Sequence, residues 1–291
     1  SLKSVDEVER VLGVPVFGTI PDFQPVVGPD TTADVDPRLV VLCEPKSSAA
    51  EGYRTLRTNI QFAEPDKRIK TLVVTSPLAS EGKTVSAANI AVVMSQLGQR
   101  TLLVDADQRR PTIHQLFHVP QEPGLSDVLI GAVSWREAVK ATPVGDLFVL
   151  SCGRMPPNPA ELLGSARMSQ LLEEWGQEYD RILLDCPPML AVTDPAMLAS
   201  KCDKTLLVIR ANQTPKEAAQ RALGMLGTVH AAVMGIILNG IRVELGYGYR
   251  YGYSYYYYHR HYHRYYSEEP RPRRRRFLRR WFARLQRSRG R

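Results

Sequence analysis

Cysteine is scarce in this chain of 291 residues, which has only Cys43, Cys152, Cys186 and Cys202. The four are scattered, and no two of them form a C-x-x-C pair. A disulfide framework would need more cysteines at closer spacing. The sequence therefore indicates free thiols and a reducing compartment.

Long apolar runs are also missing. No stretch approaches the roughly 20 residues that a bilayer-spanning helix needs, and no secretory signal peptide is visible. The first residue is Ser1 rather than Met. This absence therefore describes only the segment in hand and says nothing about a longer parent chain.

Acidic residues are absent from the last 21 positions, 271–291, which hold eleven arginines. The whole chain has 38 basic and 30 acidic residues, for a net charge of +8. Removing the eleven arginines leaves 27 basic residues against the same 30 acidic ones, a net of −3. The body is mildly acidic, and the basic charge belongs to the tail.

From residue 71 onward, apolar runs of strand length alternate with helix-like stretches at 84–97, 166–176 and 215–229. Continuous apolar strands separated by amphipathic helices predict an α/β fold of the P-loop NTPase type, a parallel sheet with helices on both faces. The predicted strands are 71–76, 101–105, 147–151, 181–185, 204–209 and 233–239.

The stretch 71–84, TLVVTSPLASEGKT, has the order of a phosphate-binding loop: a strand, a tight loop of small residues, Gly-Lys-Thr and then a helix. The N–H groups of such a loop face phosphate oxygens. Lys83 adds a positive charge, and the Thr84 hydroxyl can ligate magnesium. Pro77 stands where the usual spacing has its first glycine.

Two apolar strands deliver carboxylates at their carboxyl ends, where parallel sheets bind ligands. Asp105 and Asp107 follow the first, together with two arginines, which is dense for helix capping alone. Asp185 ends the second and has the form of a Walker B carboxylate that holds magnesium through water. Asn239 is either a nucleotide-base contact or part of an Asn-Gly turn, with equal weight. Arg210, at another strand end, is a candidate nucleotide contact.

The start of the chain predicts a lead-in module. Ser4 and Glu7 have the spacing of a capping box, which opens a short helix that Gly13 can end. A strand at 14–20 follows, and a proline stops it. Residues 23–46 are rich in proline and predict an extended connector.

A helix is predicted at about 47–62. Glu51, Arg54 and Arg57 have three-residue spacing and so lie on roughly one face. From the residues alone, the favoured interpretation is a solvated helix face with internal ion pairs. The alternative is an interaction surface.

Eleven of the thirteen tyrosines lie within the low-complexity stretch 247–266, which predicts disorder. Three interpretations stay open: stacking on single-stranded nucleic acid, adventitious metal binding by its three histidines, and a bank of phosphoacceptor hydroxyls. The nucleotide site favours the last. The candidate phosphoacceptors are Tyr247, Tyr249, Tyr251, Tyr253, Tyr255, Tyr256, Tyr257, Tyr258, Tyr262, Tyr265 and Tyr266.

The basic segment 271–291 also carries an apolar stripe on one helical face. This pattern predicts an interfacial helix on an anionic membrane. A solvated tail or nonspecific nucleic-acid contact is the alternative, but a purely electrostatic tail has no use for an aromatic stripe. The stripe comprises Phe277, Leu278, Trp281, Phe282 and Leu285.

Taken together, these motifs resemble the bacterial tyrosine kinases of capsule and exopolysaccharide synthesis (BY-kinases). The resemblance covers about 47–266. It rests on the loop 75–84, the motifs DADQRRP and ILLDCPP, the E-x-x-R-x-x-R helix, the stretch PPNPAELL and the tyrosine cluster. The lead-in 4–21 is similar to the segment after the second membrane span in fused members, in which a chain-length-determinant region and the kinase share one polypeptide.

The loop departs from the family pattern at Ala79 and Ser80, which replace a common Pro-Gly. We expect Ser80 to need a backbone angle that favours glycine. Partitioning ATPases of the Min/Par type share the sheet but carry a lysine early in this loop, where Leu78 stands here, and they lack a tyrosine tail. Such an ATPase without kinase activity is the alternative function.

The resemblance implies an ATP- and magnesium-dependent protein-tyrosine kinase that phosphorylates its own tail in trans and regulates exopolysaccharide or capsule polymerisation and export. It implies catalytic roles for Lys83, Asp105, Asp107 and Asp185, and magnesium binding by Thr84, Asp105 and Asp185. The expected ATP contacts are Ser80, Glu81, Gly82, Lys83, Thr84, Val85, Arg210 and Asn239.

The resemblance also implies partners. Glu51, Arg54 and Arg57 would join neighbouring copies in a ring at the cytoplasmic face of the bacterial inner membrane. The other expected partners are a membrane chain-length-determinant region fused upstream, an anionic membrane surface and a phosphotyrosine phosphatase, with no nucleic acid. The expected division is a juxtamembrane lead-in and connector (1–46), a kinase domain (47–246), a tyrosine-rich tail (247–270) and a basic amphipathic tail (271–291).

Overall fold

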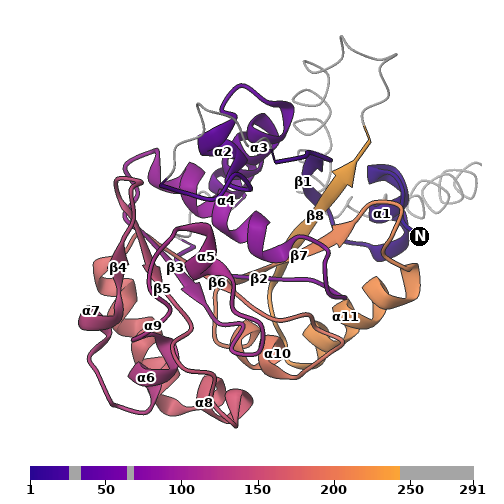
Figure 1. Cartoon of the computed structure of the whole chain (residues 1–291). Helices are drawn as coiled ribbons and strands as arrows, with labels where there is room; N and C mark the ends of the chain where they lie inside the picture. Colours follow the sequence, from indigo (N-terminus) through magenta and orange to yellow (C-terminus); the bar gives the residue numbers. More distant parts are fainter. Residues whose placement is uncertain (26–33, 64–68, 243–291) are drawn as a thin grey trace, which may run out of the picture. The chain divides into compact units, whose positions relative to one another are not determined.

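The computed structural model describes residues 1–25, 34–63 and 69–242. The predictions for the tyrosine-rich segment and for the basic C-terminal segment lie outside these residues. Within them, the strands form a single sheet in the order β1-β8-β7-β2-β6-β3-β5-β4, and helices pack on it (Figure 1). The predicted α/β fold is confirmed.

All neighbouring strands are parallel except β4 and β5. Parallel neighbours need crossover connections, which explains why helices separate most consecutive strands. The strands are β1 Val16–Pro21, β2 Thr71–Thr75, β3 Thr101–Asp105, β4 Lys140–Ala141, β5 Leu147–Leu150, β6 Arg181–Asp185, β7 Lys204–Arg210 and β8 Val233–Ile241.

The long helices agree with their predicted ranges within about three residues. Most of the short helices are not predicted by the sequence, because four to six residues do not establish a helical period. The helices are α1 Val5–Leu12, α2 Val40–Cys43, α3 Ser48–Phe62, α4 Lys83–Ser95, α5 Ile113–Leu116, α6 Leu125–Leu129, α7 Trp135–Ala138, α8 Pro159–Gly164, α9 Ala166–Glu178, α10 Asp194–Ala199 and α11 Lys216–Thr228.

Two helical layers bury the sheet. On one face, Val73 of β2 shares a core cluster with Trp175 of α9, and Leu207 of β7 shares a second cluster with Leu226 of α11. Helix α4 belongs to neither cluster and contacts β2, β3 and β6 from the other side (Figure 1). Its residues from Ser86 to Ser95 are all buried, so the helix after the phosphate loop is held on every side.

The predicted lead-in is built into this sheet. The Ser4 hydroxyl accepts a hydrogen bond from the Glu7 N–H at 3.3 Å, and Gly13 ends α1 with φ of +67°. Strand β1 pairs in parallel with β8 and runs on through Pro21. Leu2 is fully buried. These first residues are therefore part of the folded body.

The extended connector predicted at 23–46 is wrong in its second half, where α2 forms. The Val41 N–H donates to the Asn89 Oδ1 of α4 at 3.1 Å, and Val40 and Val41 are buried. Packing against α4 stabilises this turn of helix, which the proline-rich composition concealed. No helix among the described residues combines the length and apolarity needed to cross a membrane.

Candidate active site

The phosphate loop connects β2 to α4, as its sequence predicts, with Lys83 as the first helical residue. Two residues of the loop have left-handed backbones, Ser80 with φ of +64° and Gly82 with φ of +93°. The angle expected for Ser80 is confirmed. Glycine is favoured at Gly82 by its left-handed backbone, and a Cβ there would lie 2.2 Å from the Nδ2 of Asn239, which would have to move.

The sheet register brings the predicted carboxylates together. Asp105 and Asp185 are paired residues at the carboxyl ends of the neighbouring strands β3 and β6, and β6 also adjoins β2. Both side chains are buried, and Asp107 is 4% exposed. Three carboxylates from two strands thus meet beside the phosphate loop.

Lys83 is the cation of this cluster. Its Nζ donates to the Oδ2 of Asp107 at 2.9 Å, to the Oδ1 of Asp185 at 3.4 Å and to the Thr84 hydroxyl at 3.1 Å. The ammonium group therefore lies among the residues predicted to bind magnesium and to act in catalysis.

Burial and crowding decide the protonation of these groups. Burial raises the pKa of Asp105 well above its usual range, and the charge of Asp185 raises it further. Burial also raises the pKa of Asp185, while Lys83 opposes the change. Burial lowers the pKa of Lys83, but the charges of Asp185 and Asp107 outweigh it and raise the pKa. Lys83 therefore stays charged and anchors the cluster.

Asp105 and Asp107 differ in what their oxygens do. Asp105 accepts three backbone N–H groups, from Asp107 at 3.3 Å, Thr112 at 3.1 Å and Ile113 at 3.0 Å. Asp107 uses Oδ1 for backbone N–H groups but presents Oδ2 to Lys83. Asp105 thus holds the loop after β3. Asp107 differs, because its Oδ2 would become available if Lys83 moved away.

The oxygen donors of the cluster fit magnesium. The Oδ2 of Asp185 is buried without a hydrogen-bond partner among the described residues, and the Thr84 hydroxyl lies in the same cluster. Hydroxyl and carboxylate oxygens suit this hard cation, which usually retains waters and phosphate ligands. The described residues contain no group of three or more His, Cys, Asp or Glu that could hold a metal alone, so nucleotide phosphates and water would complete the coordination.

The two predicted nucleotide contacts at strand ends have protein partners in this structure. The Asn239 side chain donates from Nδ2 to the Glu81 carbonyl at 2.9 Å and is 6% exposed. Arg210 pairs with Asp22 at 2.6 Å. Asn239 therefore contacts the phosphate loop, and Arg210 ends β7, the strand beside β2. Contact of either residue with a nucleotide stays a prediction.

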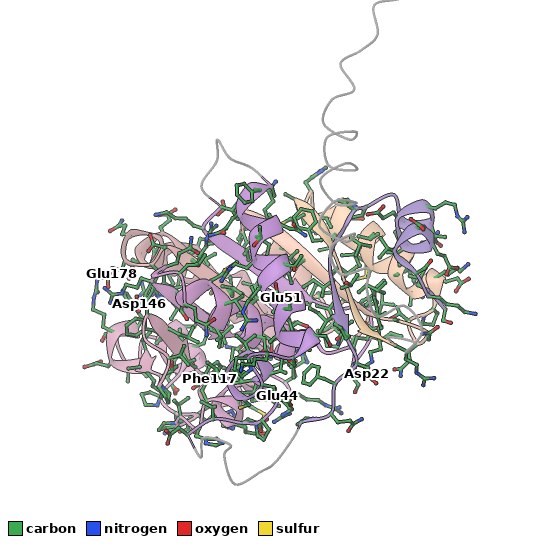
Figure 2. The ribbon with its side chains drawn as sticks, turned by 90° about the horizontal axis from the view of Figure 1, so that it is seen from above. Asp22, Glu44, Glu51, Phe117, Asp146 and Glu178 are labelled. Atoms are coloured by element: carbon green, nitrogen blue, oxygen red, sulfur yellow. The ribbon has the colours of Figure 1, made fainter. Side chains whose placement is uncertain are left out.

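All three residues predicted for oligomerisation have intramolecular contacts. Arg54 donates to the Pro45 carbonyl at 2.7 Å and pairs with Glu51 at 3.1 Å. Arg57 donates to the Val93 carbonyl, in the last turn of α4, at 3.2 Å. Glu51 is mostly exposed on α3 (Figure 2). The internal ion pair predicted for this helix is present, and Arg57 also links α3 to the helix that follows the phosphate loop.

Two residues that support the site are not predicted by the sequence. Asp194, fully buried at the start of α10, pairs with Arg109 at 2.9 Å and so ties the loop after β3 to α10. The Thr214 hydroxyl, between β7 and α11, donates to the Glu81 carboxylate. An Asp-Pro helix start was the only signal at Asp194, and Thr214 carried none.

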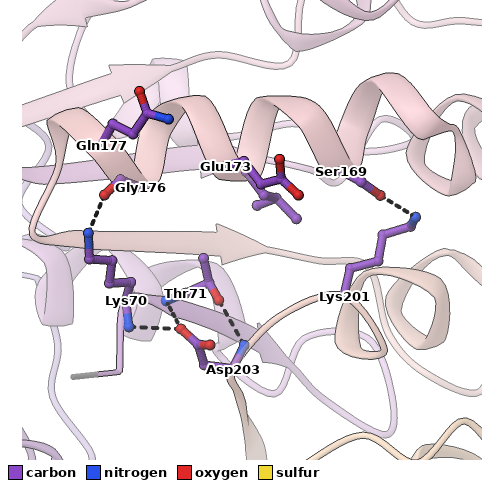
Figure 3. Close-up of a pocket in the computed structure, with 9 residues that line it drawn as sticks. Lys70, Thr71, Ser169, Glu173, Gly176, Gln177, Lys201 and Asp203 are labelled. Atoms are coloured by element: carbon purple, nitrogen blue, oxygen red, sulfur yellow. Dashed lines mark hydrogen bonds between the residues drawn. The ribbon is translucent and has the colours of Figure 1, made fainter. Parts of the chain in front are cut away.

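A groove of about 470 Å³ lies elsewhere, between α9 and the amino ends of strands β2 and β7 (Figure 3). In it, the Lys70 ammonium donates to the Gly176 carbonyl and Lys201 donates to the Ser169 hydroxyl at 2.7 Å. The phosphate loop follows the carboxyl end of β2, so the groove and the carboxylate cluster occupy opposite edges of the sheet. The groove is therefore not the nucleotide site.

Known proteins are similar to this chain in sequence and in fold. A family described as an AAA domain matches residues 69–234. Tyrosine-protein kinase YwqD of Bacillus subtilis (strain 168) is 43% identical over 213 residues, which cover 72% of this chain and 90% of the relative. The kinase domain of Escherichia coli tyrosine kinase ETK superposes with a TM-score of 0.79 at 32% identity, covering 86% of this chain and 100% of that domain.

Another relative is much longer. Putative tyrosine-protein kinase EpsB of Ralstonia nicotianae (strain ATCC BAA-1114 / GMI1000) is 34% identical over 248 residues. The match covers 83% of this chain but only 33% of that relative. The family match, the near-complete alignment with YwqD and the superposition on a kinase domain agree with the phosphate loop and its carboxylates: the chain belongs to the bacterial tyrosine-protein kinases.

Proposed function

We propose that this kinase uses ATP and magnesium to phosphorylate the tyrosine cluster of its own C-terminal segment in trans. The observation that carries the proposal is the contact of Lys83 with Asp107, Asp185 and Thr84 at the end of the phosphate loop. A lysine, two carboxylates and a hydroxyl within hydrogen-bond reach are the groups that phosphoryl transfer requires.

Each group has a defined task. The N–H groups of 80–84 bind phosphate oxygens, and Lys83 moves from the carboxylates to the β- and γ-phosphates. Thr84 and Asp185 would hold magnesium, with Asp105 supporting the site, and the ion would supply positive charge that stabilises the phosphates during transfer.

The departure of Lys83 frees an oxygen of Asp107 for the acceptor tyrosine. Asp107 Oδ2 takes the phenolic proton as the phenolate oxygen bonds to the γ-phosphorus, and the bond between that phosphorus and the β–γ bridging oxygen breaks to release ADP. A tyrosine hydroxyl has a pKa of about 10, so alignment contributes more than basicity does. The resemblance leaves Asp107 or Asp105 as the group that orients or deprotonates the tyrosine. We favour Asp107, because Asp105 accepts three backbone N–H groups.

The test is phosphotyrosine formation after incubation with ATP and magnesium. We expect wild type to become modified, and Lys83→Met and Asp107→Asn chains to lose most of the signal. The exposed Glu173→Ala substitution on α9 is the matched control and should retain it. A wild type that hydrolyses ATP without acquiring phosphotyrosine would support the Min/Par-type alternative instead.

Assembly and location are part of the proposal. Copies would join through α3, at Glu51, Arg54 and Arg57, in a ring at the cytoplasmic face of the inner membrane. EpsB is about three times as long as the matched segment, which supports a membrane chain-length-determinant region upstream. Phosphates on the tail would repel neighbouring tails and loosen the ring, and a phosphotyrosine phosphatase would reverse this. The cycle would regulate exopolysaccharide or capsule polymerisation and export.

The basic segment 271–291 would bind the anionic membrane surface, where each arginine contributes about 1 kcal/mol. Phosphotyrosines would compete with lipid for these arginines. Flotation with anionic liposomes tests the idea. We expect Trp281→Ala with Phe282→Ala to reduce flotation, and an unchanged result would contradict insertion of the aromatic stripe.

A further inference from the structure

Glu81 links three parts of the fold at the phosphate loop. Its Oε2 accepts the Leu78 N–H at 2.8 Å, and its Oε1 accepts the Thr214 hydroxyl. Its main-chain carbonyl accepts the Nδ2 of Asn239 at 2.9 Å. One residue thus joins the start of the loop, the β7–α11 connection and β8. The side chain is buried, with the residue only 4% exposed.

The loop needs such support because of its backbone. Glu81 lies between Ser80 and Gly82, both of which have positive φ. Left-handed geometry is unfavourable for serine and persists only where surrounding contacts enforce it. The three hydrogen bonds of Glu81 are contacts of this kind.

The partner on the far side of Glu81 is itself fixed. The Thr214 hydroxyl accepts the Arg210 N–H at 2.8 Å, which leaves its proton directed at Glu81. The Thr214 carbonyl accepts the Leu2 N–H at 3.2 Å. Thr214 is therefore a rigid donor, and its bond to Glu81 can set the position of the loop.

The choice of a carboxyl group is costly at this position. Among the described residues, no lysine, arginine or histidine forms a salt bridge with Glu81. Burial raises the pKa of Glu81 to about 7, although hydrogen bonds from Thr214, Leu78 and Ser76 oppose the change. A buried carboxyl group without a countercharge is unfavourable for stability. What a carboxyl group offers at this position is two oxygens, one of which accepts the Leu78 N–H while the other accepts the Thr214 O–H.

We propose that Glu81 is the positioning residue of the phosphate loop, holding it through Thr214 and Leu78 in the conformation that directs the N–H groups of 80–84 at ATP. The inference rests on the proposed nucleotide site and adds a residue that acts through the loop, without touching the reacting atoms. Thr214, from a separate connection, is the second half of the device.

The test separates positioning from folding by steady-state kinetics of the full chain. We expect Glu81→Ala to raise the KM for ATP about ten-fold and Thr214→Val about five-fold, with kcat changed less than two-fold, because a displaced loop weakens ground-state and transition-state binding alike. A merely destabilised enzyme would lose active molecules and hence kcat at unchanged KM. Thr214→Ser keeps the hydroxyl and should stay within two-fold of wild type, as should Glu173→Ala.

The double variant Glu81→Ala, Thr214→Val shows whether the residues act together. If they do, its KM should lie within two-fold of the Glu81→Ala value. A KM near the product of the two single effects would overturn the proposal, as would an unchanged KM in Glu81→Ala. Binding of Mg-ADP to wild type, measured by calorimetry, is the reference. A wild type that binds no nucleotide overturns the proposed function as well, whereas normal binding beside an unaffected Glu81→Ala overturns this inference alone.

Discussion

The raised pKa of Glu81 makes the stability of this kinase depend on pH. Its pKa rises from an ordinary 4.5 to about 7 in the folded state, chiefly because of burial. Between these values the folded chain keeps a proton that the unfolded chain has released. The stabilisation of the folded state that comes from this bound proton is therefore complete below about pH 4.5 and is lost as the pH rises through 7.

The magnitude follows from the two values. One pKa unit corresponds to about 1.4 kcal/mol, so the full difference corresponds to about 3 kcal/mol, of which about 2 kcal/mol falls between pH 5 and pH 8. The glutamine side chain of a Glu81→Gln variant cannot ionise, and it resembles the protonated glutamic acid in shape and charge. As the pH rises from 5 to 8, the free energy of unfolding of Glu81→Gln should therefore increase by about 2 kcal/mol relative to that of wild type.

Urea denaturation of both chains at pH 5, 6, 7 and 8 measures this difference. Subtracting the two stability curves cancels the contributions of other titrating groups, including Asp105 and Asp185, whose pKa values burial also raises. A difference that stays constant within about 0.5 kcal/mol would refute the reasoning. A difference of opposite sign would show that a cation stabilises the ionised form.

Three other substitutions test contacts around the site by urea denaturation. Arg57→Ala should lower the free energy of unfolding by about 1 kcal/mol, because it removes a hydrogen bond to the last turn of α4. Ser80→Gly should raise it by up to about 1 kcal/mol by relieving a left-handed backbone, and a loss would contradict the strain. Asp194→Asn should lower it by about 2 kcal/mol, because Arg109 loses its buried charged partner. Glu173→Ala, the common control, should change it by less than about 0.5 kcal/mol.

The parallel sheet could be predicted because each strand carries its own signal. Runs such as 101–105 and 181–185 are apolar throughout, and this marks strands buried on both faces. The short helices could not be predicted, since α2 at Val40–Cys43 forms through packing on α4 and its bond to Asn89, far along the chain. Strand order also depends on contacts that no local pattern records.

The site divides in the same way. Lys83, Asp105 and Asp185 follow from local motifs at strand ends, and the sheet register then brings them together. The left-handed angle at Ser80 is expected because Ser80 stands where the family commonly has a glycine, and the structure confirms it. Thr214 and Asp194 escaped prediction because each meets its partner across more than 80 positions of sequence. No spacing rule connects residues that distant.

Strand β1 occupies the position next to β8 in the sheet. It covers one side of β8, a nine-residue apolar strand, while α3 covers β1 in turn, with the Asn59 amide donating to the Phe17 carbonyl at 2.7 Å. A chain shortened to begin at residue 47 would leave β8 with a row of unpaired N–H and C=O groups, a template for strand addition. We expect such a chain to associate through β8, which size-exclusion chromatography of chains that begin at residue 1 and at residue 47 would measure.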